Sequence, residues 1–197
     1  MSENSCYLVA GCPGQRELGH LAVWSVSSAK AGNGVDCLRD GRRDTFWQSD
    51  GSQPHFVNIQ FQRKVELMEL HLFLDYKTDE SYTPSKVSIR AGTALHDLQE
   101  VHVVELDEPT GCIRVPLAAG VQQNLTPDAH LEYLEDASPL HTFFLQIAVL
   151  SNHQNGRDTH IRLVRVYGPR ADPMPLAALS LPCSIKTCSF GMYASVR

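Results

Sequence analysis

The sequence predicts an all-β fold, an antiparallel sandwich with few short helices, on the basis of two observations. Several short segments alternate between apolar and polar residues with a period of two, and turn-forming residues separate these segments. The chain has 197 residues, of which 43% are hydrophobic and 20% charged, as is typical of a globular protein. This composition argues against disorder, and no apolar run is long enough for a membrane-spanning helix.

The expected strands lie in the central part of the chain. In residues 56–61, Val57, Ile59 and Phe61 share one face, and polar residues occupy the other. Comparable alternation marks residues 70–74, 87–91 and 113–117. Residues 143–150 are apolar on nearly both faces, which is typical of a strand in the middle of a sandwich.

Two irregular features complete the expected domain. A last strand is expected at residues 161–167, with a bulge near Leu163 and Val164, where the alternation slips. Residues 35–39 follow a Gly-Asn-Gly sequence and are expected to form one short helical turn. Alternation with a period of two therefore dominates, and helix signals are few.

Three segments stand apart from the expected sandwich, which spans residues 16–169. Residues 1–15 are expected to form a flexible N-terminal arm, and residues 118–140 a polar excursion. Residues 170–197 begin with closely spaced prolines and are expected to form a linker and an extended C-terminal tail. The N-terminus has no basic segment followed by a long apolar one, so we expect an intracellular protein.

Motifs of common catalytic and metal sites are missing from the sequence. It contains no Gly-rich phosphate loop, no G-x-S-x-G and no H-E-x-x-H. The six cysteines form no C-x-x-C, and the surroundings of Cys37 and Cys112 favour reduced core thiols. His153 and His160 are not at a usual zinc spacing. We therefore expect no catalytic residue, no metal ion and no cofactor.

Acidic loop residues raise one enzymatic possibility. Asp79, Glu80 and Asp158 would suit a glycosidase, which needs two carboxyl groups beside its substrate. Their polar context favours solvated side chains, and this is our expectation. A hydrolase on a sandwich scaffold is a third hypothesis, weakened because no nucleophile and base are recognisable together.

Three loops carry more specific residues than ordinary connectors do. In residues 40–54, two adjacent aromatic residues precede an Asp-Gly turn, and Trp47 is expected to be a core anchor. Residues 75–86 are dense in hydrogen-bonding groups. Eight of the nine residues at 152–160 have hydrogen-bonding side chains, and Gly156 is expected to turn the chain at positive φ. Polar loops on rigid strands favour a recognition surface, although a plain Asn-Gly hairpin turn is the alternative for the third loop.

Four motifs together strongly resemble those of one family. They are VWSVSS at 23–28, FWQSDG at 46–51, DESYTPSK at 79–86 and NHQNGRDTH at 152–160. In this order they are similar to the Doc-domain subunit, subunit ten, of the anaphase-promoting complex or cyclosome, over about residues 16–169. The resemblance implies a jelly-roll β-sandwich of the galactose-binding type, in agreement with the strands expected from the alternation.

The resemblance also implies a function. Members of this family are non-catalytic substrate-recognition subunits of an E3 ubiquitin ligase. With a WD-repeat coactivator they form the co-receptor for the destruction box (D-box) of cell-cycle proteins, and they promote processive ubiquitination. The implied partners are this coactivator, D-box substrates such as cyclins and securin, and other subunits, including a tetratricopeptide-repeat scaffold. The implied location is the nucleus and cytoplasm. The formal net charge of −5 argues against nucleic acid as a partner, and the lack of a long apolar run argues against a membrane.

Two sets of site residues follow from the resemblance. D-box binding is implied for Ser81, Tyr82, His153, Asn155, Gly156, Arg157 and Asp158, with Ser49, Asp50 and His160 behind them. Asn155 and Ser81 supply both donors and acceptors for an extended peptide backbone. The alternative for Asp158 is to hold Arg157 in place.

The last residues form the second implied site. Val196 and Arg197 stand where the family usually ends in Ile-Arg, the tail that docks on the scaffold subunit. A hydrophobic side chain, a guanidinium and a carboxylate suit a pocket that pairs both charges. A frayed end is the alternative for this segment.

A free-standing carbohydrate-binding module of the same sandwich class is the alternative function. Trp47, Tyr76 and Tyr82 lie beside polar loops, where aromatic rings suit stacking on sugars. The ligase motifs and the absence of a recognisable secretion signal disfavour this alternative.

Overall fold

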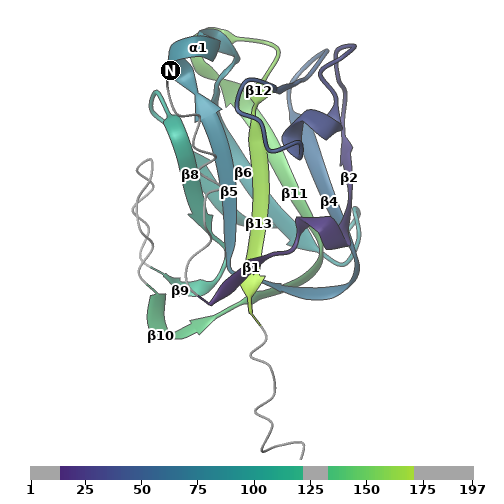
Figure 1. Ribbon diagram of the computed structural model, residues 1–197, viewed down its shortest axis with the longest axis vertical. Coiled ribbons are helices and arrows are strands. Elements are labelled where there is room, and N and C mark those ends of the chain that lie inside the picture. The colour runs from purple at the N-terminus through teal and green to yellow at the C-terminus, as the bar shows by residue number, and fades with distance from the viewer. Residues whose placement is uncertain (1–13, 122–132, 171–197) are drawn as a thin grey trace, which may run out of the picture.

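Two antiparallel sheets pack face to face in the computed structural model, which describes residues 14–121 and 133–170 (Figure 1). One sheet has four strands, in the spatial order β1 (Gln15–Glu17), β13 (Leu163–Pro169), β5 (Glu69–Asp75) and β8 (Thr110–Pro116). The other has five, in the order β2 (Ala22–Val26), β4 (His55–Leu67), β11 (Leu140–Asn152), β6 (Pro84–Gly92) and β7 (Gln99–Glu105). The predicted all-β sandwich is therefore confirmed.

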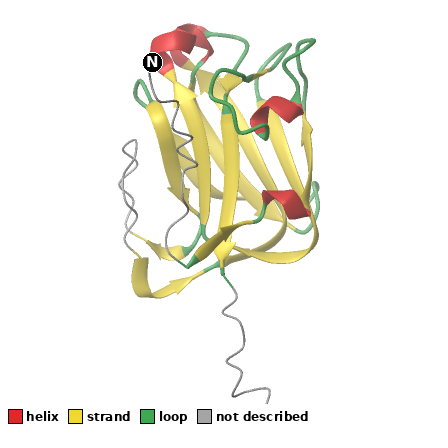
Figure 2. Ribbon diagram, viewed as in Figure 1, coloured by secondary structure: helices red, strands yellow, loops and turns green. Residues whose placement is uncertain are grey.

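Short elements lie at the two ends of the sandwich (Figure 2). The strands β3 (Trp47–Gln48) and β12 (His160–Ile161) pair with each other, as do β9 (Ala119–Val121) and β10 (Tyr133–Ser138). The described helical segments are η1 (Gly19–Leu21), η2 (Val35–Leu38), α1 (Tyr76–Asp79), η3 (Glu80–Tyr82) and η4 (His153–Asn155). None of these described helices has the length and apolar character that crossing a bilayer requires.

Alternating apolar residues of the two sheets form one core between them. In the central strand β11, Leu145, Ile147 and Val149 are fully buried. On the facing sheet, β5 contributes Leu70 and Leu72 to the same cluster. Burying a side chain of this size stabilises the fold by about 2 kcal/mol, so the alternating positions carry much of the stability.

The segments selected by alternation lie in strands, as predicted. Residues 57–61, 70–74, 87–91 and 143–150 lie within β4, β5, β6 and β11, and residues 113–117 largely within β8. The helical turn expected at 35–39 is η2. Trp47 is fully buried, as expected of a core anchor. Of the two cysteines expected in the core, Cys112 is buried and Cys37 is only half-buried.

Two edge strands, β7 and β2, were not predicted from the sequence. The strand β7 forms one edge of the five-stranded sheet, and most of its side chains are partly or fully exposed. The strand β2 forms the other edge, where Val23 is 61% exposed. Because an edge strand buries little of either face, its apolar residues need not alternate cleanly.

The last predicted strand is interrupted rather than bulged near Leu163 and Val164. The chain forms β12 up to Ile161 and β13 from Leu163, and these two strands pair with different partners. Arg162 lies between them, with its backbone N–H donating to the carbonyl of Phe73 at 3.1 Å. The buried side chain of this arginine, described below, is the physical reason for the break in alternation.

The segment expected as a polar excursion contains regular structure in its described part. Residues 119–121 and 133–138 form the pair β9 and β10, and Leu140 already begins β11. Near the two ends of the described chain, Gln15 and Arg16 in β1 pair with Pro169 and Gly168 in β13.

The close contact of β13 with β4 gives a test of the packing. Gly168 is buried, and a Cβ atom there would overlap the carbonyl oxygen of Glu66. We predict that Gly168→Ala lowers the free energy of unfolding by about 1–3 kcal/mol, because the backbone must shift. The matched control is Gly34→Ala, since Gly34 has a φ of −86° and open space around its Cβ position. Urea denaturation should show a lower midpoint for Gly168→Ala alone, and equal midpoints would contradict this packing.

Candidate functional site

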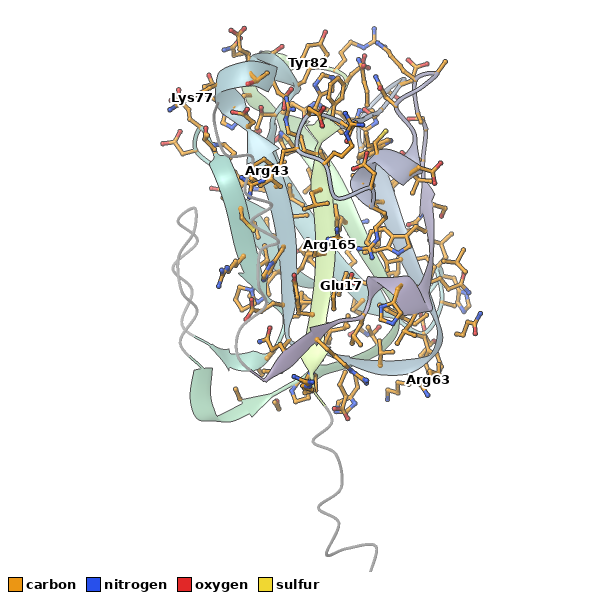
Figure 3. The ribbon with its side chains drawn as sticks, in the orientation of Figure 1. Glu17, Arg43, Arg63, Lys77, Tyr82 and Arg165 are labelled. Carbon is orange, nitrogen blue, oxygen red and sulfur yellow. The ribbon has the colours of Figure 1, made fainter. Side chains whose placement is uncertain are left out.

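Loops from both sheets meet at one end of the sandwich, which we call the loop end (Figure 3). It comprises residues 27–34, 48–54, 76–83 and 152–160, and Tyr82 is labelled there in the figure. Backbone hydrogen bonds join these loops directly. The N–H of Ser49 donates to the carbonyl of Thr159 at 3.1 Å, and the N–H of His153 donates to that of Thr83 at 2.9 Å.

A buried ion pair lies beneath the loop end. Asp79 is 5% exposed and Arg162 is 6% exposed. The guanidinium donates through Nε to Oδ2 of Asp79 at 2.9 Å and through Nη2 to Oδ1 at 2.7 Å. Its Nη1 donates to the carbonyl of Arg43 at 2.8 Å. This arginine therefore joins α1, the 40–46 loop and the junction of β12 and β13, and the expectation that Asp79 is solvated was wrong.

His160 stacks on two aromatic rings above this ion pair. Its ring lies 4.3 Å from the Tyr82 ring, nearly parallel at 8°, and 4.1 Å from the Phe46 ring. Its Nδ1 is 3.1 Å from Oδ1 of Asp79, so Nδ1 carries the donated proton when that carboxylate is charged. Because His160 is buried, it positions Tyr82, whose own side chain is 39% exposed.

Two opposing influences act on the pKa of Asp79. Burial alone would raise it, but hydrogen bonds from His160 and Arg162, with the charge of Arg162, hold it below the ordinary value of 3.8. A carboxyl group of this kind stabilises the fold above its unfolded pKa, and the stabilisation is lost as the pH falls through the folded pKa. The ion pair is therefore fully formed at neutral pH and is lost only in acid below pH 3.8.

Side chains of neighbouring strands hold the backbone of the third loop. Asn152, Gln53 and His55 hydrogen-bond to the carbonyl groups of residues 156–158, at distances from 2.7 to 3.2 Å. Two of these side chains, Asn152 and His55, are themselves buried. The loop backbone is thus fixed from below, while its exposed side chains face the solvent.

Gly156 has a different role from the one expected. Its φ is −58°, and the positive values belong to Gln154 at 51° and Asn155 at 56°, within the turn η4. A Cβ atom on Gly156 would overlap the carbonyl oxygen of Ser81. Glycine is therefore required by close packing of the third loop on the second, and the plain Asn-Gly hairpin is not formed.

Unusual backbone conformations concentrate at the loop end. Among the described residues, four non-glycine residues have positive φ, and three of them, Glu80, Gln154 and Asn155, lie there. Each such residue costs of order 1–3 kcal/mol unless its surroundings fix it. Strain of this kind clusters at functional sites, which singles out this surface as the candidate.

Charged side chains at the loop end are only partly neutralised. Nζ of Lys30 lies 2.5 Å from Oδ2 of Asp158, and this hydrogen bond raises the pKa of Lys30. Asp158 is therefore paired with Lys30, and does not hold Arg157 as considered above. Arg157 is exposed and has no ion-pair partner within the described ranges. Asp50 supplies an exposed carboxylate on the neighbouring loop.

All ten residues that the resemblance implies for D-box binding lie at the loop end, at different depths. The exposed residues are Asp50, Tyr82, Asn155 and Arg157. The half-buried ones are Ser81, His153, Gly156 and Asp158, and the buried ones are Ser49 and His160. Four of the ten residues are therefore accessible at the surface, and two are not. Val196 and Arg197 lie outside the described residues.

Several residues of this site could not be identified from the sequence. Arg162 belongs to none of the four motifs, and its buried pairing had no sequence signal because its partner is distant in the chain. Asp79 begins one motif, but its loop context suggested a solvated side chain. Lys30 follows the first motif and gave no signal. Within the described residues, no group of three His, Cys, Asp or Glu side chains is arranged to hold a metal ion.

Removing the guanidinium of Arg162 tests the buried pair. We predict that Arg162→Met lowers the free energy of unfolding by about 3–5 kcal/mol, because Asp79 loses a buried charged partner. Arg162→Met combined with Asp79→Asn should recover part of this loss. The control is Arg42→Met, since the ion pair of Arg42 with Asp44 is exposed. Denaturant unfolding measures all four proteins, and equal losses for Arg162→Met and Arg42→Met would contradict the assignment.

Solved structures show which fold this is. A family 32 carbohydrate-binding module of Clostridium perfringens NanJ, in complex with galactose, has a TM-score of 0.57 and 11% sequence identity. The match covers 78% of this chain and 98% of that module. A fucolectin from Morone saxatilis serum also gives 0.57, at 10% identity, and the match covers 80% of this chain and 48% of the lectin chain. Identities this low show a shared galactose-binding-like jelly roll and nothing about ligands.

Sequence comparison identifies the family. The family model described as anaphase-promoting complex, subunit 10 (APC10) matches residues 3–195. Anaphase-promoting complex subunit 10 of Homo sapiens is 50% identical over 182 residues, covering 92% of this chain and 88% of the human protein. The Schizosaccharomyces pombe subunit is 40% identical over 166 residues, covering 84% of this chain and 80% of its own length. This chain therefore belongs to the family of anaphase-promoting complex subunit 10.

Proposed function

We propose that this chain is a non-catalytic substrate-recognition subunit of the anaphase-promoting complex, an E3 ubiquitin ligase. It forms the co-receptor for the D-box with a WD-repeat coactivator and promotes processive ubiquitination of cell-cycle proteins. Family membership supports the coarser statement, that the chain is a subunit of this multisubunit complex. The proposed role as a D-box co-receptor rests on the residues of the loop end.

One observation carries the proposal, the exposure of polar side chains on a buried, rigid support. Tyr82, Asn155 and Arg157 are exposed, while the residues beneath them are buried and hydrogen-bonded. A surface fixed in this way loses little conformational entropy when a peptide binds. Polar loops on a rigid scaffold favour recognition of an extended segment.

The exposed groups match the chemistry of a D-box, an extended segment with an arginine and a leucine. Asn155 provides both a donor and an acceptor for a peptide backbone, and Ser81 beside it provides a hydroxyl. Asp50 offers a carboxylate to a cation. The outer part of the Tyr82 ring, stacked from below by His160, offers apolar surface.

Weak individual contacts at the loop end suit a co-receptor. Each exposed hydrogen bond contributes about 1 kcal/mol or less, so the surface alone binds a short peptide weakly. When the coactivator holds the same peptide, the second contact becomes intramolecular, and its effective concentration rises to the millimolar range. Substrate then stays longer on the ligase, which increases the ubiquitin molecules added per binding event.

Further partners are proposed from the family resemblance. Val196 and Arg197, outside the described residues, are proposed to dock on a tetratricopeptide-repeat scaffold subunit. Residues 170–197 would serve as the connecting linker and tail. We propose the nucleus and cytoplasm as the location, where the complex and its cell-cycle substrates meet.

The carbohydrate-binding alternative finds little support in the aromatic residues that motivated it. Trp47 is fully buried and donates its Nε1–H to the carbonyl of Ser28 at 2.9 Å, so it offers no face to a sugar. Tyr76 packs edge-on against His153. Of these three residues Tyr82 alone is exposed, at 39%, and a single exposed ring is a weak sugar platform. A glycan array with the purified chain distinguishes the two functions.

The co-receptor proposal predicts a loss of processivity in a loop-end variant. Complex carrying Asn155→Ala with Ser81→Ala should bind a D-box substrate about tenfold more weakly, because two hydrogen-bonding side chains are lost. Fewer ubiquitins should be added in a single encounter. The measurement is single-turnover ubiquitination of a labelled D-box substrate, with excess unlabelled substrate added at the start.

A matched control separates this effect from general damage. Gln60→Ala with Ser25→Ala removes an exposed amide and an exposed hydroxyl from β4 and β2, outside the four segments of the loop end. Complex with the control variant should behave as wild type. Unchanged chain length per binding event in the loop-end variant would contradict the proposed site.

A further inference from the structure

A second charged surface lies at the end of the sandwich opposite to the loop end. We call it the basic groove, and its cations are Arg16, Arg63, Lys64 and Arg170. Figure 3 shows Arg63 at the far end of the molecule from Tyr82. The groove has a volume of about 440 Å³. It lies between the second half of β4, the start of β1 and the end of β13.

The groove is positively charged, although the chain as a whole is negatively charged. The whole chain has a formal net charge of −5, yet the described residues that line the groove include four exposed cations and one carboxylate, Glu66. That carboxylate is already 3.9 Å from Nδ1 of His141. Across residues 14–121 and 133–170, none of the four cations forms an ion pair. The groove therefore attracts negatively charged groups.

The floor of the groove is apolar. Leu18 and Val65 are buried members of the core, and Leu21 and Pro169 are half-buried beside them. A purely ionic ligand would leave this floor in contact with water. None of the described residues that line the groove is aromatic, so they form no stacking platform of the kind on which single-stranded nucleic acids depend. A ligand that combines carboxylates with aliphatic side chains fits both the rim and the floor.

We propose that the basic groove binds an acidic peptide segment with interspersed apolar residues, contributed by another subunit of the complex. Charge complementarity and the apolar floor select this occupant. The position of the groove leaves the loop end free for a second ligand. Arg170 is the last described residue before the proposed docking tail, so a subunit that bound both the groove and that tail would gain affinity from the combination. This inference does not depend on the D-box role.

Fluorescence anisotropy with three labelled peptides tests the groove in the full-length chain. The probes are peptides of alternating Glu and Leu, of Gln and Leu, and of Glu and Ser, all of one length. We expect the Glu-Leu peptide to bind most tightly, and more weakly as salt is added. Equal binding of the Glu-Ser peptide, or of a labelled polyuridine RNA, would indicate a general polyanion surface and would overturn the proposal.

Charge reversal then locates the binding surface. Arg63→Glu should weaken binding of the Glu-Leu peptide about fivefold, since an attractive charge becomes a repulsive one. The matched control is Lys77→Glu, which makes the same charge change at an exposed position of α1, within the loop end and far from the groove. Its affinity should stay within about twofold of wild type. Equal weakening by both substitutions would mean that overall charge governs binding, and the groove would be rejected.

Discussion

The carboxylate of Asp79 and the guanidinium of Arg162, both almost inaccessible to water, set the geometry of the loop end. Removing two charges from water is costly, and the two-point hydrogen bonding to Asp79, with the additional bond to Arg43, offsets that cost. Replacing both partners of such a pair by apolar residues usually costs little stability, whereas removing one partner costs much. We infer that the pair serves mainly to select one arrangement of the chain. Here the arrangement is that of three segments distant in sequence, because α1, the 40–46 loop and the β12–β13 junction meet at one guanidinium.

A series of contacts connects this ion pair to the exposed residues. Asp79 accepts the hydrogen bond that orients His160, and His160 stacks beneath Tyr82. On the adjoining loop, Gly156 allows the backbone to pack against the Ser81 carbonyl. The exposed side chains therefore stand on buried groups that fix them. The basic groove lies at the other end, so the proposed substrate surface and the proposed assembly surface are at opposite ends of the sandwich.

Much of the fold was predictable from alternation, because strands with one buried face show it directly, as Val57, Ile59 and Phe61 do. Edge strands such as β7 bury too little for a pattern to appear. The motifs located the loop end in the sequence, but they did not predict which of its residues are buried and which are exposed. Gly156 shows why: its sequence context suggested a turn, whereas the requirement comes from Ser81, a contact that only the folded chain creates. The pairings of Lys30 and Arg162 escaped prediction for the same reason.

The jelly roll is shared with carbohydrate-binding modules, yet its aromatic residues are used here for support, with Trp47 in the core and Tyr82 stacked on His160. We propose that the exposed loop end, held by the buried pair, is the D-box surface. Nuclear magnetic resonance titration of the labelled full-length chain with a D-box peptide examines this surface residue by residue. The amide signals of Tyr82, Asn155 and Arg157 should shift, while those of Arg63 and Lys64 should stay in place. Shifts confined to the basic groove, or no shift at the loop end with the coactivator present, would contradict it.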